Sequence, residues 1–394
     1  MILNANWSYP TAVRFGPGRI TELAAACRAA GIARPLLVTD RGLSGLPMIA
    51  RALDLCREEG LAVSVFDGVQ PNPVESNVRD GVSAFREGRH DGVIAVGGGS
   101  ALDCGKLIAF MAGQTRPIWD FEDIGVWWTR ADAAAIAPIV AVPTTAGTGS
   151  EVGRAGVITD EGTQTKKIIF HPKMMPSISV CDPELTIGLP RTITAGTGMD
   201  ALAHCLEAYC APGFHPLADG IAAEGVRLVL AYLPRAVAVG TDIEARAQMM
   251  AAAAMGATAF QKGLGAIHSL SHPIGAICNT HHGMTNAVFM PYVLAFNRAA
   301  ITERVERLAA YCGMQPSFDA FLQRVLELRQ GIAVPHTIRE LGVDHALADR
   351  IAEMAIVDPT AGGNPVKLTR DAARAIFEAA YAGHISLDRD GQMD

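Results

Sequence analysis

Apolar and polar positions in the first half of the chain alternate between two periods. Short apolar runs, typical of buried strands, occupy residues 34–40, 61–66, 91–96 and 138–143. Segments with helical spacing separate them at residues 46–59 and 74–87, and a third ends at Phe110. Strands that alternate with helices predict a parallel sheet with helices on both faces.

The pattern changes near residues 183–190. Beyond that stretch, helical spacing dominates at residues 198–209, 218–231, 244–260 and 301–312, and convincing strand patterns are absent. We therefore predict an α/β domain over residues 1–188 and an all-helical domain over residues 189–394. The length agrees with two domains, because single cores stop growing at roughly 250–300 residues.

Composition narrows the functional classes. Hydrophobic residues make up 49% of the chain and charged residues 19%, as in proteins with folded cores. The formal net charge of −7 offers no basic surface for nucleic acid or anionic lipid. No apolar run reaches the ~18 residues of a membrane span, and residues 1–10 lack a signal-peptide pattern. We expect neither a nucleic acid nor a membrane as partner.

The cysteines predict the compartment. Eight are scattered along the chain, and none forms a close CxxC pair. This distribution favours buried thiols in a reducing compartment over a disulfide framework or a zinc ribbon. The simplest location is the cytoplasm.

A glycine-rich turn follows the third predicted strand. Gly98, Gly99 and Ser100 stand where this strand passes into a helix. Glycines let a ligand approach the backbone, and the free amides and positive dipole end of a helix favour phosphate. A single turn of this kind is weak evidence, because many such turns bind nothing.

A second loop of similar character follows the fourth predicted strand. It offers the hydroxyls of Thr144, Thr145 and Thr148 beside two further glycines. Two such loops at the carboxyl ends of parallel strands predict a dinucleotide site.

Asp40 ends the first predicted strand and bears on the choice of dinucleotide. A carboxylate at this sheet edge accepts hydrogen bonds from the ribose hydroxyls of NAD and repels the 2′-phosphate of NADP. This position favours NAD, although a turn or a helix cap is an equally good interpretation of the aspartate.

Histidines cluster in the second half of the chain. Asp200 and His204 are four residues apart, as are His268 and His272, and His282 follows ten residues later. A spacing of four places two side chains on one helical face. Isolated helical histidines are usually ordinary core or surface residues, but this group with an aspartate fits a divalent metal site. Spacing alone leaves open whether these side chains converge.

These motifs together resemble the iron-containing, or group III, alcohol dehydrogenase family. The shared segments are long and ordered: GGGSALDCGK, PTTAGTGSE, GMDALAHCLEAY and GAIHSLSHPIGAICNTHHGMTNA. The resemblance covers nearly the whole chain. It implies a dehydroquinate synthase-like fold, with a Rossmann-like NAD-binding domain, an all-helical metal-binding domain and the active site in the cleft between them.

The resemblance also implies roles for individual residues. The metal ligands would be Asp200, His204, His268 and His282, and the metal Fe²⁺, with Zn²⁺ as an alternative. His272 matches a histidine near the nicotinamide, and His281 is expected not to bind the metal. The residues implied to contact NAD are Asn72, Gly98, Gly99, Ser100, Thr144, Thr145, Thr148 and Lys166; neighbouring Lys167 leaves the register of the lysine open by one residue.

The resemblance implies hydride transfer between NAD(H) and an alcohol or aldehyde of the primary alcohol, diol or hydroxy-acid class. It also implies a homodimer or higher homo-oligomer. Ala155-Gly156 and the Trp127-Trp128 loop depart from many relatives, so a particular substrate cannot be carried over. The alternatives are a hydroxyacid–oxoacid transhydrogenase, a dehydroquinate synthase-like lyase and a binding module with a relic site. The lyase's basic residues for a phosphorylated substrate are not evident, and intact ligands and loops argue against the relic.

Overall fold

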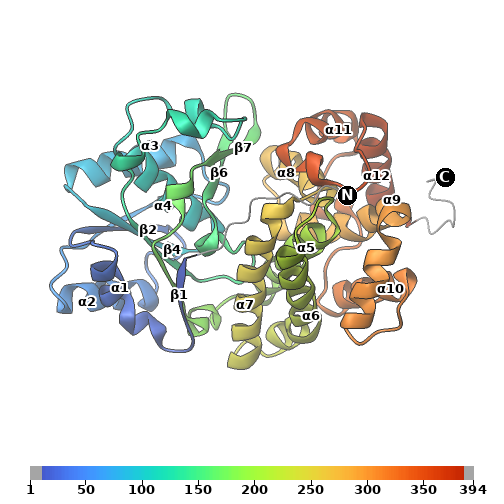
Figure 1. Cartoon of the computed structure of the whole chain (residues 1–394), viewed down its shortest axis with the longest axis horizontal. Helices are drawn as coiled ribbons and strands as arrows, with labels where there is room; N and C mark the ends of the chain where they lie inside the picture. The colour runs from blue at the N-terminus through green and yellow to red at the C-terminus, as the bar shows by residue number, and fades with distance from the viewer. Residues whose placement is uncertain (1–10, 386–394) are drawn as a thin grey trace. The chain divides into compact units, whose positions relative to one another are not determined.

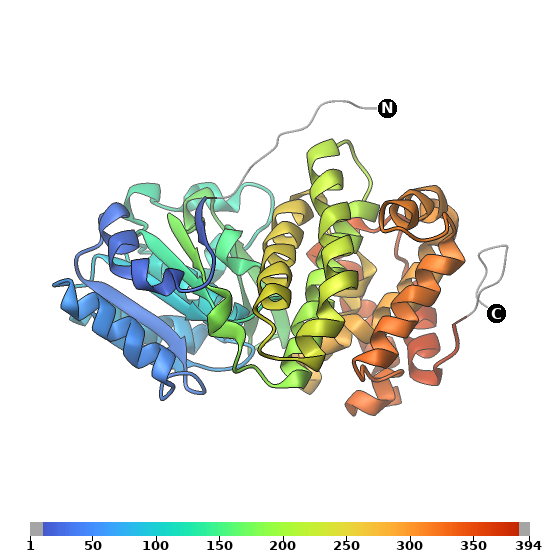
Figure 2. The same ribbon diagram turned by 90° about the horizontal axis from the view of Figure 1, so that it is seen from below.

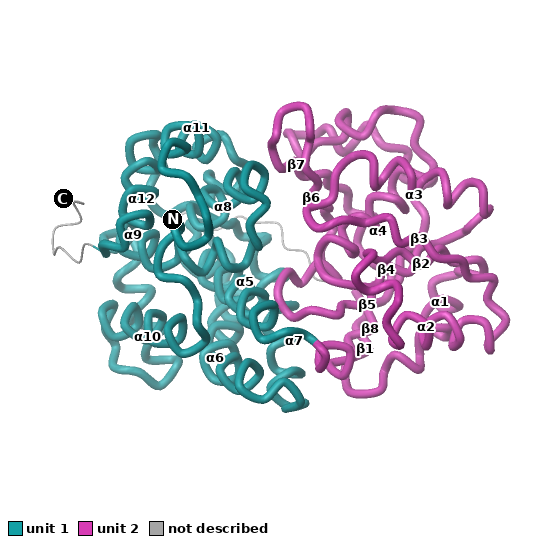
Figure 3. Tube along the Cα trace, turned by 180° about the vertical axis from the view of Figure 1, so that it is seen from behind, with its two compact units in different colours: residues 1–8, 189–394 teal, residues 9–188 magenta. Residues whose placement is uncertain are grey.

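A computed structural model describes residues 11–385 and divides the chain into two compact units. One unit lies within residues 9–188 and the other within residues 189–394 (Figure 3). Residues 1–10, for which we predict no signal peptide, lie outside the described residues.

The first unit is built on a six-stranded sheet in the order β1-β8-β5-β4-β2-β3, whose strands are labelled in Figure 3, and every neighbouring pair is parallel. Its strands are β1 (Ala12–Phe15), β2 (Pro35–Asp40), β3 (Ser64–Val69), β4 (Gly92–Gly97), β5 (Ile139–Pro143) and β8 (Ile178–Cys181). Its helices are α1 (Leu23–Ala29), α2 (Pro47–Glu58), α3 (Glu75–Glu87) and α4 (Gly99–Met111).

Each face of this sheet is covered by its own hydrophobic core. Successive side chains of a strand point to opposite faces, so they enter different cores. In β4, Val93 and Ala95 pack into one core with α3 and α4, whereas Ile94 and Val96 pack into another with α1 and α2. All six residues of β4 are therefore buried, which explains its continuous apolar run. The predicted fold class of this half is confirmed.

One strand begins later than its apolar run. The run starts at Leu61, but β3 begins at Ser64. The amide of Leu61 donates to the carbonyl of Cys56 at the end of α2, and its side chain is buried with α1 and α2. Leu61 is thus apolar because it closes a helix, not because it belongs to the sheet.

Four strands escaped the sequence pattern. The short edge strand β1 pairs with β8. The paired residues Ala12 and Ile178 are 166 positions apart in the sequence. Strands β6 (Ala155–Asp160) and β7 (Thr165–Phe170) form a separate antiparallel hairpin. Few of the hairpin residues are fully buried, so no apolar run marks it.

A buried carboxylate lies directly after the second predicted cofactor loop. Glu151 is 2% exposed, and its burial raises the pKa of the carboxyl group to about 7. A backbone hydrogen bond and the charge of Lys106 oppose this shift without cancelling it. Lys106 is itself buried, with its Nζ 3.1 Å from Asp103 Oδ1.

Glu151→Gln should stabilise the protein at neutral and higher pH. Because the folded pKa lies above the ordinary value of 4.5, the folded state binds more protons between pH 4.5 and 7, so wild-type stability falls as pH rises through this window. The variant should gain up to about 3 kcal/mol in the free energy of unfolding at pH 8 and little at pH 5. Urea unfolding at both pH values measures this gain, with exposed Glu58→Gln as control. An unchanged pH dependence in Glu151→Gln would contradict the prediction.

The second unit is helical (Figures 1 and 2). Its α-helices are α5 (Arg191–Cys210), α6 (Pro216–Ala238), α7 (Ile243–Ala259), α8 (Ala266–Cys278), α9 (His282–Tyr311), α10 (Phe318–Gly331), α11 (Ala348–Val357) and α12 (Arg370–Ala382). No strand occurs in residues 189–385, so the predicted helical class of this half is also confirmed. Within residues 11–385, no helix has the length and apolarity needed to cross a bilayer.

Two helices differ from their predicted form in ways that affect the metal centre. Helix α5 is buried on nearly all sides after its first turn, so the polar residues on it are enclosed by protein. The segment predicted at residues 301–312 is the end of the 30-residue helix α9. Pro291 lies inside α9 without ending it, because proline removes one helical hydrogen bond that buried neighbours can compensate.

Candidate metal centre and cofactor loops

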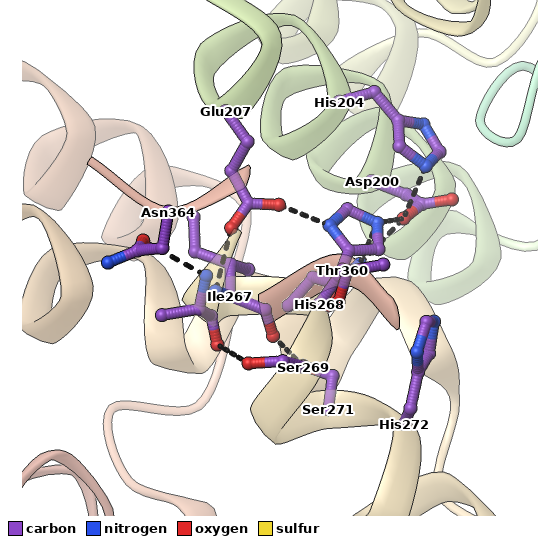
Figure 4. A network of polar contacts seen from close by, with 12 residues as sticks. Asp200, His204, Glu207, Ile267, His268, Ser269, Ser271, His272, Thr360 and Asn364 are labelled. Atoms are coloured by element: carbon purple, nitrogen blue, oxygen red, sulfur yellow. Dashed lines mark hydrogen bonds and ion pairs between the residues drawn. The ribbon is translucent and has the colours of Figure 1, made fainter. Parts of the chain in front are cut away.

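Three helices supply the predicted metal ligands. Asp200 and His204 lie one turn apart on α5, His268 lies on the first turns of α8, and His282 begins α9. Asp200, His204 and His268 are all at most 5% exposed, and their ligand atoms lie within 4.8 Å of one another. Figure 4 shows these three side chains converging from α5 and α8.

The ligand atoms gather around a single carboxylate oxygen. Asp200 Oδ1 lies 3.9 Å from His204 Nε2, 3.8 Å from His268 Nε2 and 3.5 Å from His282 Nε2. For comparison, ligand atoms at the corners of a tetrahedron with bonds of about 2.1 Å are about 3.4 Å apart. The structure therefore brings Asp200, His204 and His268 together at separations suited to one cation, and it places His282 Nε2 next to the same carboxylate oxygen.

An asparagine completes this arrangement. Asn286 is fully buried, and its Nδ2 donates to Asp200 Oδ1 at 2.8 Å while lying 3.2 Å from His268 Nε2 and 3.1 Å from His282 Nε2. Among the described residues, its Oδ1 has no hydrogen-bond partner. One carboxylate and three imidazoles form a donor set that suits a divalent cation. The residues present thus fit the implied metal.

A glycine lets α9 approach α5 at the centre. A Cβ atom built on Gly283 would lie 2.1 Å from the carbonyl oxygen of Gly196 and 3.1 Å from Asp200 Cβ. Any side chain there would push the two helices apart. The glycine that follows His282 is therefore needed to hold this histidine beside Asp200.

His281 has a different role from its neighbour. It is the N-cap of α9, where its Nδ1 accepts a hydrogen bond from the amide of Met284 at 3.3 Å. The side chain is exposed. This cap explains two consecutive histidines of which only His282 faces the centre.

His272 lies beside the ligands and is held by a carboxylate. Its ring stacks on His282 with centroids 5.4 Å apart, and its Nδ1 lies 2.8 Å from Asp358 Oδ2. Burial favours a higher pKa for Asp358, but the charge of His272 and hydrogen bonds from His272 and Thr360 outweigh it and lower the pKa. Because a carboxylate only accepts, His272 donates from Nδ1.

The two predicted cofactor loops lie against each other at the ends of β4 and β5. The amide of Thr144 donates to the carbonyl of Gly97 at 2.9 Å. A Cβ atom on Gly99 would lie 2.5 Å from Thr148 Cγ2, and one on Gly98 would lie 3.3 Å from Thr145 Cγ2. A side chain at Gly99 would therefore displace Thr148, whereas Gly98 has only a tight contact with Thr145. Ser100 stands in the first turn of α4, where no side chain among the described residues caps the helix.

Asp40 ends β2 beside the first loop. Its Oδ1 accepts a hydrogen bond from the amide of Leu43 at 3.0 Å, so the side chain does stabilise a turn. Its Oδ2 is 3.6 Å from the position of a Cβ atom on Gly97. The turn therefore employs one carboxylate oxygen, and the other is directed toward the glycine loop.

Asn72 and Lys166 lie on other parts of the same unit. Asn72 stands between two prolines after β3 with a φ of 51°, a left-handed conformation that asparagine tolerates. Lys166 and Lys167 point to opposite sides of β7, and Lys167 pairs with Asp160 at 3.1 Å and with Glu122 at 3.5 Å. Lys167 therefore belongs to an ion-pair cluster with Asp160 and Glu122.

The Trp127-Trp128 loop packs on its own domain. Trp128 lies edge-on to Phe170 and to His171, with ring centroids 6.3 Å and 5.7 Å away. The guanidinium of Arg130 covers the ring of Trp127 at 4.0 Å. These contacts support packing as the role of both tryptophans.

Three residues of the metal centre were not found from the sequence: Glu207, Asn286 and Asp358. Glu207 follows Asp200 and His204 at a spacing of seven and three residues, which keeps it on one face of α5 and could have identified it. Asn286 is one turn after His282, a weaker signal. Asp358 is 86 residues from His272, and no local pattern connects them.

Taken together, the parallel α/β unit with two glycine-rich loops and the helical unit with an Asp/His₃ centre define a metal-dependent dinucleotide dehydrogenase. Residues 10–183 match the family described as iron-containing alcohol dehydrogenase, and residues 194–381 match its C-terminal domain. The chain belongs to the iron-containing alcohol dehydrogenase family. The predicted family and enzyme class, NAD-dependent alcohol dehydrogenases, are confirmed.

Individual relatives cover the whole chain. The 4-hydroxybutyrate dehydrogenase of Cupriavidus necator is 41% identical over 381 residues, which are 94% of this chain and 98% of the relative. A crystal structure of 1,3-propanediol oxidoreductase superposes with a TM-score of 0.91 at 36% identity, covering 96% of this chain and 100% of that one. The sulfoacetaldehyde reductase of Bifidobacterium kashiwanohense, solved with NAD⁺, gives a TM-score of 0.87 at 30% identity and covers 96% and 99%.

Proposed function

We propose that this protein transfers a hydride between NAD(H) and a small primary alcohol, diol or hydroxy acid, or the corresponding aldehyde. The observation that carries the proposal is that the Nε2 atoms of His204, His268 and His282 all lie within 3.9 Å of Asp200 Oδ1. We assign metal binding to residues 189–394 and NAD binding to residues 1–188, with Asp40, Asn72, Ser100 and Lys166 among the cofactor contacts.

The metal, NAD and the side chains would each have a separate role in the reaction. When bound, a divalent metal would supply Lewis acidity and NAD would supply a hydride acceptor. Asp200, His204, His268 and His282 would hold the metal in a largely buried site, where electrostatic effects are stronger than in water. His272 donates from Nδ1 to Asp358, which leaves Nε2 to accept the hydroxyl proton and pass it toward solvent.

The family to which the chain belongs, iron-containing alcohol dehydrogenase, is the basis for proposing Fe²⁺ as the native metal. Imidazole and carboxylate ligands also suit Zn²⁺, and availability often decides between such ions. Metal analysis of protein purified without oxygen measures the identity directly.

The substrate class follows the relatives, whose names give a hydroxy acid, a diol and an aldehyde. We further propose a cytoplasmic homodimer or higher homo-oligomer. All eight cysteines are free thiols, as a reducing compartment would leave them.

The test is a panel of alcohols with NAD⁺ and of aldehydes with NADH, followed at the NADH absorbance band. We expect turnover of short primary alcohols, diols or hydroxy acids. Hydride exchange between a hydroxy acid and an oxo acid without added NAD would instead indicate the transhydrogenase. The absence of turnover across the panel, in metal-loaded protein, would contradict the proposal.

Asp40 should give the enzyme a preference for NAD. A 2′-phosphate near this carboxylate meets like charge, which costs ~1 kcal/mol at 4 Å in water and ~4 kcal/mol at an effective dielectric near 20. At ~1.4 kcal/mol per tenfold, the wild type should prefer NAD by roughly ten- to thousandfold in kcat/KM. Asp40→Gly should lower NAD use and raise NADP use.

Asp40→Asn separates this effect from the turn. Asparagine can still accept from the amide of Leu43, so the turn persists while the charge is lost. Measurements of kcat/KM for both cofactors at fixed ionic strength compare the three proteins, since salt screens the repulsion. A wild type that prefers NADP, or a ratio unmoved in both variants, would leave Asp40 as a turn residue only.

A further inference from the structure

His268 is held at both ring nitrogens. Its Nε2 lies 3.8 Å from Asp200 Oδ1 on the side of the metal centre, and its Nδ1 lies 2.5 Å from Glu207 Oε2 on the opposite side (Figure 4). Glu207 comes from α5, the helix that also supplies Asp200 and His204. One helix therefore contributes two ligands and the partner of a third.

Glu207 lies in an environment that strengthens this contact. Its side chain is 6% exposed and borders a cavity of about 20 Å³ whose lining is largely apolar, including Leu206, Ile267 and Val293. A cavity of this size has room for roughly one water molecule. Glu207 is thus shielded from bulk solvent, which strengthens its hydrogen bond to the imidazole.

The two carboxylate oxygens have separate partners. Oε1 accepts a hydrogen bond from the amide of Ile267 at 2.7 Å, at the beginning of α8, and Oε2 contacts His268. Oε1 thus stabilises the helix that carries the histidine. A second side chain, Asn364, accepts from the neighbouring amide of Ala266 at 3.1 Å. The helix start therefore does not depend on Glu207 alone.

We infer that Glu207 is a positioning residue for the metal ligand His268, an inference that rests on the proposed metal site. The carboxylate can only accept, so the Nδ1 of His268 carries the proton and the Nε2 lone pair is directed to the cation. The same hydrogen bond fixes the orientation of the ring and makes the imidazole a stronger electron donor. Loss of such an outer partner typically costs 10–100-fold in metal affinity.

Glu207→Gln is the sharpest test, because it keeps the shape and changes the chemistry. The amide oxygen can still accept from Ile267, but the NH₂ group then faces His268 Nδ1 as a donor. This favours the opposite tautomer, with the proton on Nε2, where it competes with the metal. We expect 10–100-fold weaker binding of Co²⁺, measured by competition with a chelator, and unchanged NAD binding.

Asn364→Ala is the matched control. It removes a hydrogen bond from the same helix start, together with the bonds of Asn364 to Asn297 and Val366, and none of these bonds involves His268. It should lower the melting temperature while leaving the Co²⁺ affinity within about threefold of wild type. Equal losses of affinity in both variants would show that Glu207 acts only through the helix, and wild-type affinity in Glu207→Gln would overturn the inference directly.

A measurement on the wild-type protein guards against a variant that fails to fold. ¹⁵N NMR of the histidine rings in metal-free protein, at a pH where His268 is neutral, should show this ring protonated on Nδ1; a neutral ring protonated on Nε2 instead would overturn the inference. The d–d absorption of bound Co²⁺ should also change in Glu207→Gln and not in Asn364→Ala. If wild-type protein binds no Co²⁺, the proposed metal site fails; if it does and Glu207→Gln binds equally well, only the role of Glu207 fails.

Discussion

Removal of the metal should abolish turnover, with the largest effect of any change considered for this protein. A bound cation contributes several kcal/mol to the transition state, and each ~1.4 kcal/mol is tenfold in rate, so chelation should lower kcat by at least about 10³-fold. Added Fe²⁺ or Zn²⁺ should restore it. The measurement is NADH formation in samples whose metal content is determined in parallel.

His268→Ala should reproduce this loss by mutation. It removes one of the four proposed ligands, so metal content and activity should fall together. The neighbouring pair of histidines provides the control: His281→Ala removes the N-cap of α9, which typically costs ~1 kcal/mol of stability, and should retain the metal. Full activity in a preparation shown to be metal-free would contradict the assignment of the centre.

His272→Ala should slow turnover without loss of metal or NAD. A general acid–base group typically contributes ~10²–10⁴-fold, and a relay that solvent can replace contributes less. The side chain stacks on His282, and its Nδ1 is engaged by Asp358. We therefore expect kcat to fall while Co²⁺ binding and NAD binding remain.

Two observations make the result specific. Free imidazole should restore part of the lost rate in His272→Ala, because it can occupy the emptied space and accept the proton. Metal content should stay at the wild-type level. A variant that loses its metal would identify His272 as a ligand, and the set of four would then be wrong.

Several features of this protein could be predicted from residues that are close together in the sequence. The apolar runs at β2, β4 and β5 reflect strands buried on both faces, so their composition marks them without knowledge of the partners. Asp200 and His204 share a helical face because four residues span about one turn. Such signals depend on the geometry of neighbouring residues, so they can be recognised in the sequence.

Tertiary structure decided the rest. Strand β1 has four residues, three of them exposed, and is defined by pairing with β8 across the whole α/β domain. His272 meets Asp358, and His268 meets Glu207, 86 and 61 residues away. A glycine is required at position 283 only because α9 packs closely against α5 there. These contacts exist because helices pack at specific positions, and the spacing of residues along a chain does not specify which distant side chains packing will bring together.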